Sequence, residues 1–148
     1  MTLEDALNMW EKDSVIDELN LDKTSIQTAK LHSKYLELLS ISKLRLKKKE
    51  MEFDSLKKAK WLYFEGKMTK TQMDERGWAY DPFNGGVKPM KSNMDYYYKA
   101  DPDLTRLQQQ MDYQKVLIDT LTDIMDNLKW RHQNIRNIID WRRFTAGA

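Results

Sequence analysis

The stretch that decides the fold is DPDLTRLQQQMDYQKVLIDTLTDIMDNLKWRHQNIRNIIDWRRFTAG, residues 101–147. It opens on Asp101-Pro102, a favoured helix start, because a proline at the first helical position lacks only an N–H that would have no partner there. No further glycine or proline occurs before Gly147. Mostly apolar residues recur at alternating spacings of three and four: Leu104, Leu107, Met111, Gln114, Ile118, Leu121, Met125, Leu128, His132, Ile135, Ile139 and Arg142. The stretch therefore predicts one long helix with an apolar stripe.

More apolar residues lie beside this stripe and widen it: Val116, Leu117, Ile124, Trp130, Ile138, Trp141 and Phe144. One other long helix and a loop would leave part of so wide a face uncovered, so we expect helices from other copies of the chain to cover it. We assign this assembly to Leu107, Met111, Ile118, Leu121, Met125, Leu128, Ile135 and Ile139. Gln114 and His132 interrupt the stripe and are expected to fix the register and number of helices.

A second long helix is predicted from Lys23 to about Glu65, where no glycine or proline occurs. The same spacing runs through it, with some polar positions: His32, Tyr35, Leu39, Ser42, Leu46, Lys49, Phe53, Leu56, Lys60 and Tyr63. Gly66 is well placed to end this helix. Residues 3–12 form a short amphipathic helix, and Ser14 to Leu21 is expected to add another helical turn or two.

The segment between Gly66 and Lys99 is predicted to be irregular. Thr69 or Thr71 is placed to cap one helical turn, Asn84-Gly85 is a sharp turn, and Asp95 to Tyr98 reads as a short strand or extended segment. Its basic and aromatic residues would suit contact with a polymer. Trp78 and Phe83 could equally anchor the segment on the helices, which is the expected role of at least one of them. The chain is thus expected to be all-α, divided into 1–66, 67–100 and 101–148.

The end of the second helix, Leu56-Lys-Lys-Ala-Lys-Trp-Leu-Tyr-Phe-Glu-Gly-Lys67, mixes lysines with aromatic residues. Lysines offer phosphates a mobile charge, and aromatic rings offer unpaired bases a stacking face. Candidate nucleic-acid contacts are therefore Lys57, Lys58, Lys60, Trp61, Tyr63 and Lys67. The ordinary alternative is a charged helix end whose aromatic residues, Phe64 above all, pack against a neighbour.

The net charge of +2 in 148 residues conceals a basic middle of the chain. Ten basic residues face four acidic ones between Lys43 and Lys70, namely Lys43, Arg45, Lys47, Lys48, Lys49, Lys57, Lys58, Lys60, Lys67 and Lys70 against Glu50, Glu52, Asp54 and Glu65. The sequence has no cysteine, no secretory leader pattern and no apolar run long enough for a membrane span. These features are compatible with a reducing, cytoplasmic setting, and we expect no membrane segment.

No catalytic or metal-binding constellation is evident. His32 and His132 lie far apart on separate predicted helices, with no carboxylate at ligand spacing. Gly66-Lys67-Met68-Thr69 resembles the end of a phosphate-binding loop, but Trp61 stands where the upstream glycine belongs and no strand precedes it. We expect no catalytic residue, no metal and no cofactor, and an enzyme is a distant third class.

Several short blocks resemble the UvsY family of recombination mediators of T4-like tailed phages. They are Leu3-Glu4-Asp5, Leu31-His-Ser-Lys-Tyr-Leu36, Leu56-Lys-Lys-Ala-Lys60 with Tyr63 and Gly66, Lys91-Ser-Asn-Met94, Ala100-Asp101 and Arg143-Phe-Thr-Ala-Gly147. Their order and spacing extend over nearly the whole chain. The segment Met68 to Gly86 departs from the family, being longer and more aromatic.

The resemblance implies a non-enzymatic, ring-like homo-oligomer of six or seven subunits in the cytoplasm of the infected bacterial host. It implies binding of single-stranded DNA, displacement of the phage single-strand-binding protein and loading of a RecA-like recombinase of the UvsX type. The family's Leu-Lys-Ala-Arg DNA-binding block falls on Leu56, Lys58, Ala59 and Lys60, where lysine replaces arginine and keeps the charge without the planar fork. The competing hypothesis is a coiled-coil scaffold or assembly protein that does not bind nucleic acid.

Overall fold

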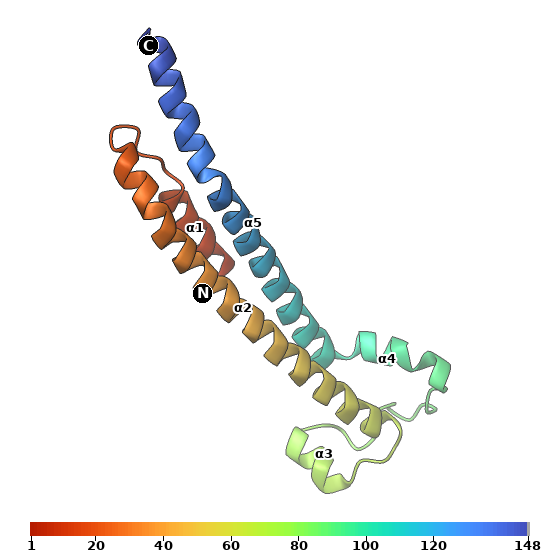
Figure 1. Ribbon diagram of the computed structural model, residues 1–148. Helices are drawn as coiled ribbons and strands as arrows, with labels where there is room; N and C mark the ends of the chain where they lie inside the picture. Colours follow the sequence, from red (N-terminus) through yellow and green to blue (C-terminus); the bar gives the residue numbers. More distant parts are fainter. Residues whose placement is uncertain (148) are drawn as a thin grey trace. The chain divides into compact units, whose positions relative to one another are not determined.

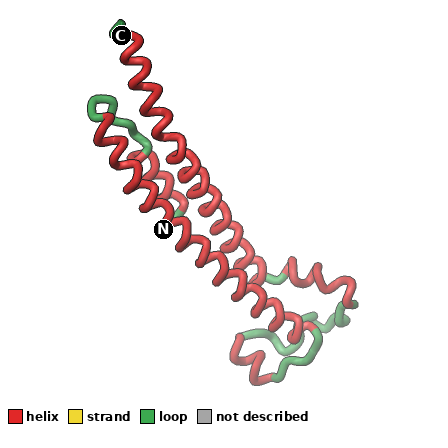
Figure 2. Tube along the Cα trace, in the orientation of Figure 1, coloured by secondary structure: helices red, strands yellow, loops and turns green. Residues whose placement is uncertain are grey.

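The computed structural model describes residues 1–147, and every regular element within them is helical (Figures 1 and 2). The helices are α1 (Leu3–Asp13), α2 (Leu21–Phe64), α3 (Lys70–Arg76), α4 (Met94–Ala100) and α5 (Pro102–Thr145), with a short 3-10 helix at Lys91–Asn93. The all-α prediction, with two long helices and a short N-terminal helix, is confirmed.

The helix boundaries follow the chemistry of the terminal residues. Asp101 caps α5, since its carboxylate accepts the Leu104 N–H at 2.9 Å. Thr69 and Gln72 form a reciprocal capping box at the start of α3. Beyond the end of α2, Gly66 takes a φ of +72°, which favours glycine.

Two local predictions were wrong. Ser14 to Asn20 is not helical, because the Asp17 carboxylate accepts the Leu19 N–H at 3.0 Å and the Asn20 side-chain amide at 2.8 Å, which stabilises a turn. Asp95 to Tyr98 is not extended but lies within α4. Helical geometry puts Met94 and Tyr98 on one face of α4, where both pack against the same core.

The chain forms two compact units. Unit 1 contains Met1–Leu46 and Tyr113–Ala148, and unit 2 contains Lys47–Asp112. The helix ends at Phe64 and Pro102 lie close to the boundaries of the predicted three-part division, but packing groups the residues differently. That division therefore remains a prediction about sequence segments.

The core of unit 1 lies between α1 and the parts of α2 and α5 in that unit. Its buried members are Ala6, Tyr35, Leu39, Leu117, Leu121, Ile124, Met125 and Leu128. Three residues assigned to assembly, Leu121, Met125 and Leu128, are buried against α1 and α2 within unit 1. Part of the wider apolar face stays exposed, at Val116, Trp130, Trp141 and Phe144. Elsewhere on α5, Met111 and Ile135 are also buried, Leu107 and Ile118 are half-buried, and Ile139 is exposed.

Polar contacts also hold unit 1 together. The guanidinium of Arg131 donates to the carbonyl oxygens of Asp13, the last residue of α1, and of Val15 just beyond it, both at 3.0 Å. Gln114 donates to the Ser42 carbonyl oxygen at 3.2 Å, so these two polar stripe positions meet. The sequence pattern placed Gln114 in the stripe, but gave no sign of the buried Arg131.

In unit 2 a second core surrounds the end of α2. Its buried residues are Ala59, Tyr63, Phe64, Met68, Met73 and Met94, with Leu62, Trp78, Phe83 and Tyr98 packed against them. The segment between α2 and α5 is therefore anchored on α2 by its aromatic side chains. The predicted turn at Asn84-Gly85 is present, with φ values of +50° and +84°.

Candidate nucleic-acid interface

The predicted contact residues divide between two faces of the last turns of α2. Lys60 and Tyr63 belong to the repeating stripe and are buried. Lys57 and Trp61 each follow a stripe residue by one position, Lys58 follows Leu56 by two, and all three are exposed, as is Lys67 just beyond the helix. Because 3.6 residues complete a turn, adjacent positions point about 100° apart. The structure therefore brings only part of the predicted set to the surface.

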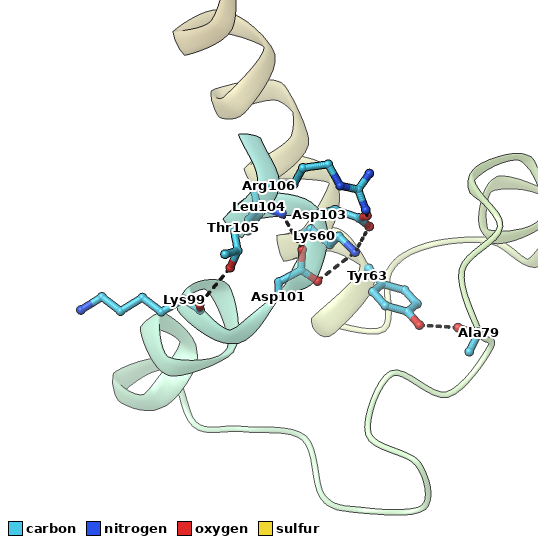
Figure 3. A network of polar contacts seen from close by, with 9 residues as sticks. All are labelled: Lys60, Tyr63, Ala79, Lys99, Asp101, Asp103, Leu104, Thr105 and Arg106. Atoms are coloured by element: carbon cyan, nitrogen blue, oxygen red, sulfur yellow. Dashed lines mark hydrogen bonds and ion pairs between the residues drawn. The ribbon is translucent and has the colours of Figure 1, made fainter. Parts of the chain in front are cut away.

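Lys60 is 4% exposed and is surrounded by its own chain. Its Nζ lies 2.9 Å from a carboxylate oxygen of Asp101 and 2.9 Å from one of Asp103, and it points between them in Figure 3. The same ammonium lies 4.0 Å from the centroid of the Trp78 ring, a cation–π distance. The expectation that Lys60 faces a phosphate is corrected, because two carboxylates already neutralise it.

Tyr63 is also occupied within unit 2. Its hydroxyl donates to the Ala79 carbonyl oxygen at 2.5 Å (Figure 3), and its ring centroid lies 5.0 Å from that of Trp78. Burial raises the pKa of Tyr63. With both the ring and the hydroxyl engaged, Tyr63 offers no stacking face. Tyr63 and the buried Phe64 therefore pack against neighbouring residues, as the alternative interpretation of this helix end expected.

The exposed lysines are paired with aromatic rings. Lys67 Nζ lies 4.8 Å from the centroid of Trp61, whose side chain is 38% exposed. Lys57 Nζ lies 5.1 Å from the ring centroid of Tyr98 in α4. A ring gives weak, non-directional attraction to an ammonium, so these lysines keep their N–H groups available for phosphates. The sequence identified the two lysines and Trp61, but not the position of Tyr98.

Two neighbouring hollows flank α4 in unit 2. The first, here called the Tyr98 hollow, has a volume of about 400 Å³ and is lined by Phe53, Lys57, Asp95, Tyr98, Lys99, Leu104, Thr105, Gln108 and Gln109. The second, the Trp61 hollow, has about 380 Å³ and is lined by Trp61, Glu65, Lys91, Met94, Asp95 and Tyr98. Asp95 and Tyr98 belong to both, so the two hollows adjoin.

A third, shallower hollow of about 430 Å³ is lined by Leu56, Arg76, Trp78, Asp103, Arg106, Leu107 and Gln110. Arg76 lies 5.1 Å from the Trp78 ring centroid, and Arg106 lies 3.7 Å from Asp103. This hollow also brings cations to an aromatic ring. Arg76 is one of the basic residues of the 66–99 segment that the sequence suggested for contact with a polymer. Arg106 was not predicted, although the i, i+3 spacing of Asp103 and Arg106 on a helix gives a local signal for their pairing.

Lys88 and Glu65 form an ion pair at 2.6 Å near the Trp61 hollow. The hydrogen bond from Lys88 holds the pKa of Glu65 below its ordinary value. Across residues 1–147, no group of three or more acidic, histidine or cysteine side chains is arranged to hold a metal ion. Within the same range, none of the helices combines the length and apolarity that a membrane crossing needs.

Known proteins resemble this chain over almost its entire length. The profile of the family described as "Recombination, repair and ssDNA binding protein UvsY" matches residues 9–148. The recombination protein uvsY of Enterobacteria phage T4 is 28% identical over 147 residues, covering 99% of both chains.

Crystal structures of the bacteriophage T4 recombination mediator protein UvsY share this fold. In lattice type II the TM-score is 0.83 at 27% identity, with 99% of this chain and 98% of that chain covered. In lattice type I the TM-score is 0.81 at 25% identity, with 95% and 98% covered.

Proposed function

This chain belongs to the UvsY family of recombination, repair and single-stranded-DNA-binding proteins, and we propose that it is a recombination mediator that binds single-stranded DNA. The observation that carries the proposal is the set of exposed cations beside aromatic rings in unit 2. Lys57 stands over Tyr98 and Lys67 over the exposed Trp61. Such a surface combines phosphate attraction with stacking faces, the two requirements for sequence-tolerant binding of a single strand.

Within this surface we assign phosphate contact to Lys57, Lys58 and Lys67, and base stacking to Trp61. Lys60 and Tyr63, both buried, act indirectly by holding the Asp101 and Ala79 segments against α2. The resemblance of position 60 to the family's DNA-binding block is thus compatible with a structural role. Loss of Lys60 would disturb the neighbouring surface without removing a phosphate contact.

Family membership is the support for proposing a finer activity. A mediator of this kind displaces the phage single-strand-binding protein and loads a RecA-like recombinase, in the cytoplasm of an infected bacterium and without enzymatic turnover. A homo-oligomer of six or seven subunits would repeat the unit 2 surface. Repetition converts weak contacts at one copy into strong binding by raising the effective concentration of the next.

Assembly is supported by apolar side chains of unit 1 that its core leaves uncovered. Trp130, Trp141 and Phe144 are mostly exposed on α5, and the Trp141 and Phe144 rings stack with centroids 5.7 Å apart. Large exposed aromatic residues in a cluster are typical of protein interfaces. We therefore place the contacts between copies on these residues and on the exposed Ile139, rather than on the buried part of the stripe.

The function is tested by measuring the affinity of the chain for a labelled oligothymidylate at several salt concentrations. Lys57→Ala with Lys58→Ala should weaken binding and reduce the slope of log affinity against log salt by about 0.7 for each phosphate that is no longer neutralised. A matched control is Lys30→Ala with Lys43→Ala, which removes the same charge from exposed positions of the same helix in unit 1.

The control variant should show the same slope of log affinity against log salt as the unmodified chain. Equal slopes for both double variants would overturn the assignment of the surface. Absence of any salt-dependent binding by the unmodified chain would favour the competing class, a helical scaffold that does not bind nucleic acid.

A further inference from the structure

The Tyr98 hollow is lined by both apolar and polar side chains. Phe53 of α2, Tyr98 of α4 and the buried Leu104 of α5 supply the apolar part. Lys57 and Lys99, both exposed, also line it. A volume of about 400 Å³ falls within the range of sites that bind small ligand groups, about 300–1,000 Å³. The hollow is therefore large enough for one flat ring system.

The polar side chains of the lining are complementary to a nucleotide rather than to a purely apolar ligand. Lys57 and Lys99 are exposed cations, and Asp95 supplies the one carboxylate of the lining. Gln108 and Gln109 add amide groups that both donate and accept, as the edge of a base requires. Burial raises the pKa of Tyr98, so its phenol stays neutral and does not repel a phosphate.

We propose that the Tyr98 hollow accepts one unpaired base of single-stranded DNA, stacked on the Tyr98 ring, with adjoining phosphates held by Lys57 and Lys99. This inference rests on the proposed function and adds a base subsite to it. It makes α4, a helix outside the basic segment of α2, the second wall of the interface.

The neighbouring Trp61 hollow extends this subsite. The two hollows share Asp95 and Tyr98, and the second is also lined by Trp61, over whose ring the Lys67 ammonium lies. A strand leaving the Tyr98 hollow on this side meets a second stacking ring and a third cation. The shared lining therefore gives the strand a path along α4.

The test is a double-mutant cycle in which the Tyr98 side chain and the base are each removed, separately and together. Tyr98→Leu and the unmodified chain are each titrated with a short oligothymidylate, and with an abasic oligonucleotide of the same length and phosphate number. Tyr98→Leu should lower affinity for the thymidylate about 5- to 100-fold, the range of base–aromatic stacking. Affinity for the abasic strand should be unchanged, and so should the salt slope, which counts phosphates.

The matched control is Tyr96→Leu. Tyr96 belongs to the same helix and is 72% exposed, but it lines neither hollow. It should leave both affinities as they are. An equal loss in the two tyrosine variants, or an equal loss on both oligonucleotides, would overturn the base subsite.

A second measurement does not depend on the folding of a variant. The unmodified chain is photocrosslinked to an oligonucleotide carrying 5-iodouracil, and the crosslinked peptide is identified by mass spectrometry. Attachment at Phe53 or Tyr98 supports the subsite, and attachment only at other peptides overturns it.

These outcomes separate the inference from the function on which it rests. If the unmodified chain binds the thymidylate and abasic strands equally, phosphate binding stands and the base subsite falls. If it binds neither strand, both fall, and an aromatic side chain of a protein partner becomes the better occupant of the hollow.

Discussion

Lys60 and Asp101 form a buried ion pair that joins the last turns of α2 to the start of α5. The two charged groups lie 2.9 Å apart, and their side chains are 5% and 7% exposed. Asp101 simultaneously caps α5 through the Leu104 N–H. One carboxylate thus serves both a local helix end and a long-range charge pair, so that disturbing Lys60 also disturbs the start of α5.

Lys60→Ala should lower the free energy of unfolding by about 3–5 kcal/mol, because it leaves the buried Asp101 without a counter-charge. Urea denaturation followed by circular dichroism measures the loss. Lys58→Ala is the control, since the exposed Lys58 should change stability by no more than about 0.5 kcal/mol. Comparable losses in the two variants would contradict the structural role of Lys60.

Arg131→Lys should destabilise the chain by about 1.5–3 kcal/mol. An ammonium cannot reproduce the planar fork with which the buried Arg131 reaches the carbonyl oxygens of Asp13 and Val15. Hydrogen exchange should then quicken at the end of α1. Arg136→Lys, at an exposed position of the same helix, should be nearly neutral, and equal effects would show that the cap of α1 does not depend on the fork.

Protonation of Asp13 should lower the free energy of unfolding of the chain in acid. Burial alone would raise its pKa, but hydrogen bonds from Lys34 at 2.6 Å and Tyr35 at 2.8 Å outweigh burial and hold the pKa below 3.8. A carboxyl with a lowered folded-state pKa stabilises fully above its unfolded-state value, and that stabilisation is lost as pH falls through the folded-state pKa.

Unfolding free energies of the unmodified chain and Asp13→Asn should therefore differ most above the ordinary pKa of an Asp carboxyl, about 4, and the difference should shrink as pH falls below it. Denaturant titrations across this pH range measure the two curves. A gap that stays constant with pH would show that the Asp13 charge does not contribute.

Two substitutions on α5 should separate folding from assembly. Leu121→Ala removes a fully buried side chain of the unit 1 core and should cost about 2–5 kcal/mol. Trp130→Ser with Trp141→Ser changes two largely exposed residues and should reduce the mass in solution while helicity is retained. Sedimentation measures the mass in solution, and circular dichroism measures helicity and stability. An unchanged mass in the tryptophan variant would place the interface elsewhere.

The helices and their ends were predictable because their signals are local. The Asp101-Pro102 start, the Thr69 cap and Gly66 each act within a few residues, and the structure confirms all three. Ser14 to Asn20 was missed because a side chain, that of Asp17, competes with the helix. Local apolar spacing alone does not measure that competition.

The sequence also held a sign that Lys60 is buried rather than exposed to DNA. Its position in the stripe with Leu56 and Tyr63 already implied an inward side chain, but its charge favoured an outward one. Resolving that conflict required Asp101 and Asp103, which lie beyond the whole 67–100 segment. The Tyr98 hollow escaped prediction for the same reason, because its walls come from three helices.

The link from Lys60 to the start of α5 has a consequence for the order of folding. Lys60 and Asp103 are 43 positions apart, whereas Ser42 and Gln114 are 72 apart and Asp13 and Arg131 are 118 apart. Closing the inner contact first shortens the free chain that every outer contact must still close, and so lowers its entropic cost. We therefore expect the contacts nearest the segment between the two long helices to form first and those of unit 1 to follow. Amides of unit 2 should gain protection before those of unit 1 in pulsed hydrogen exchange.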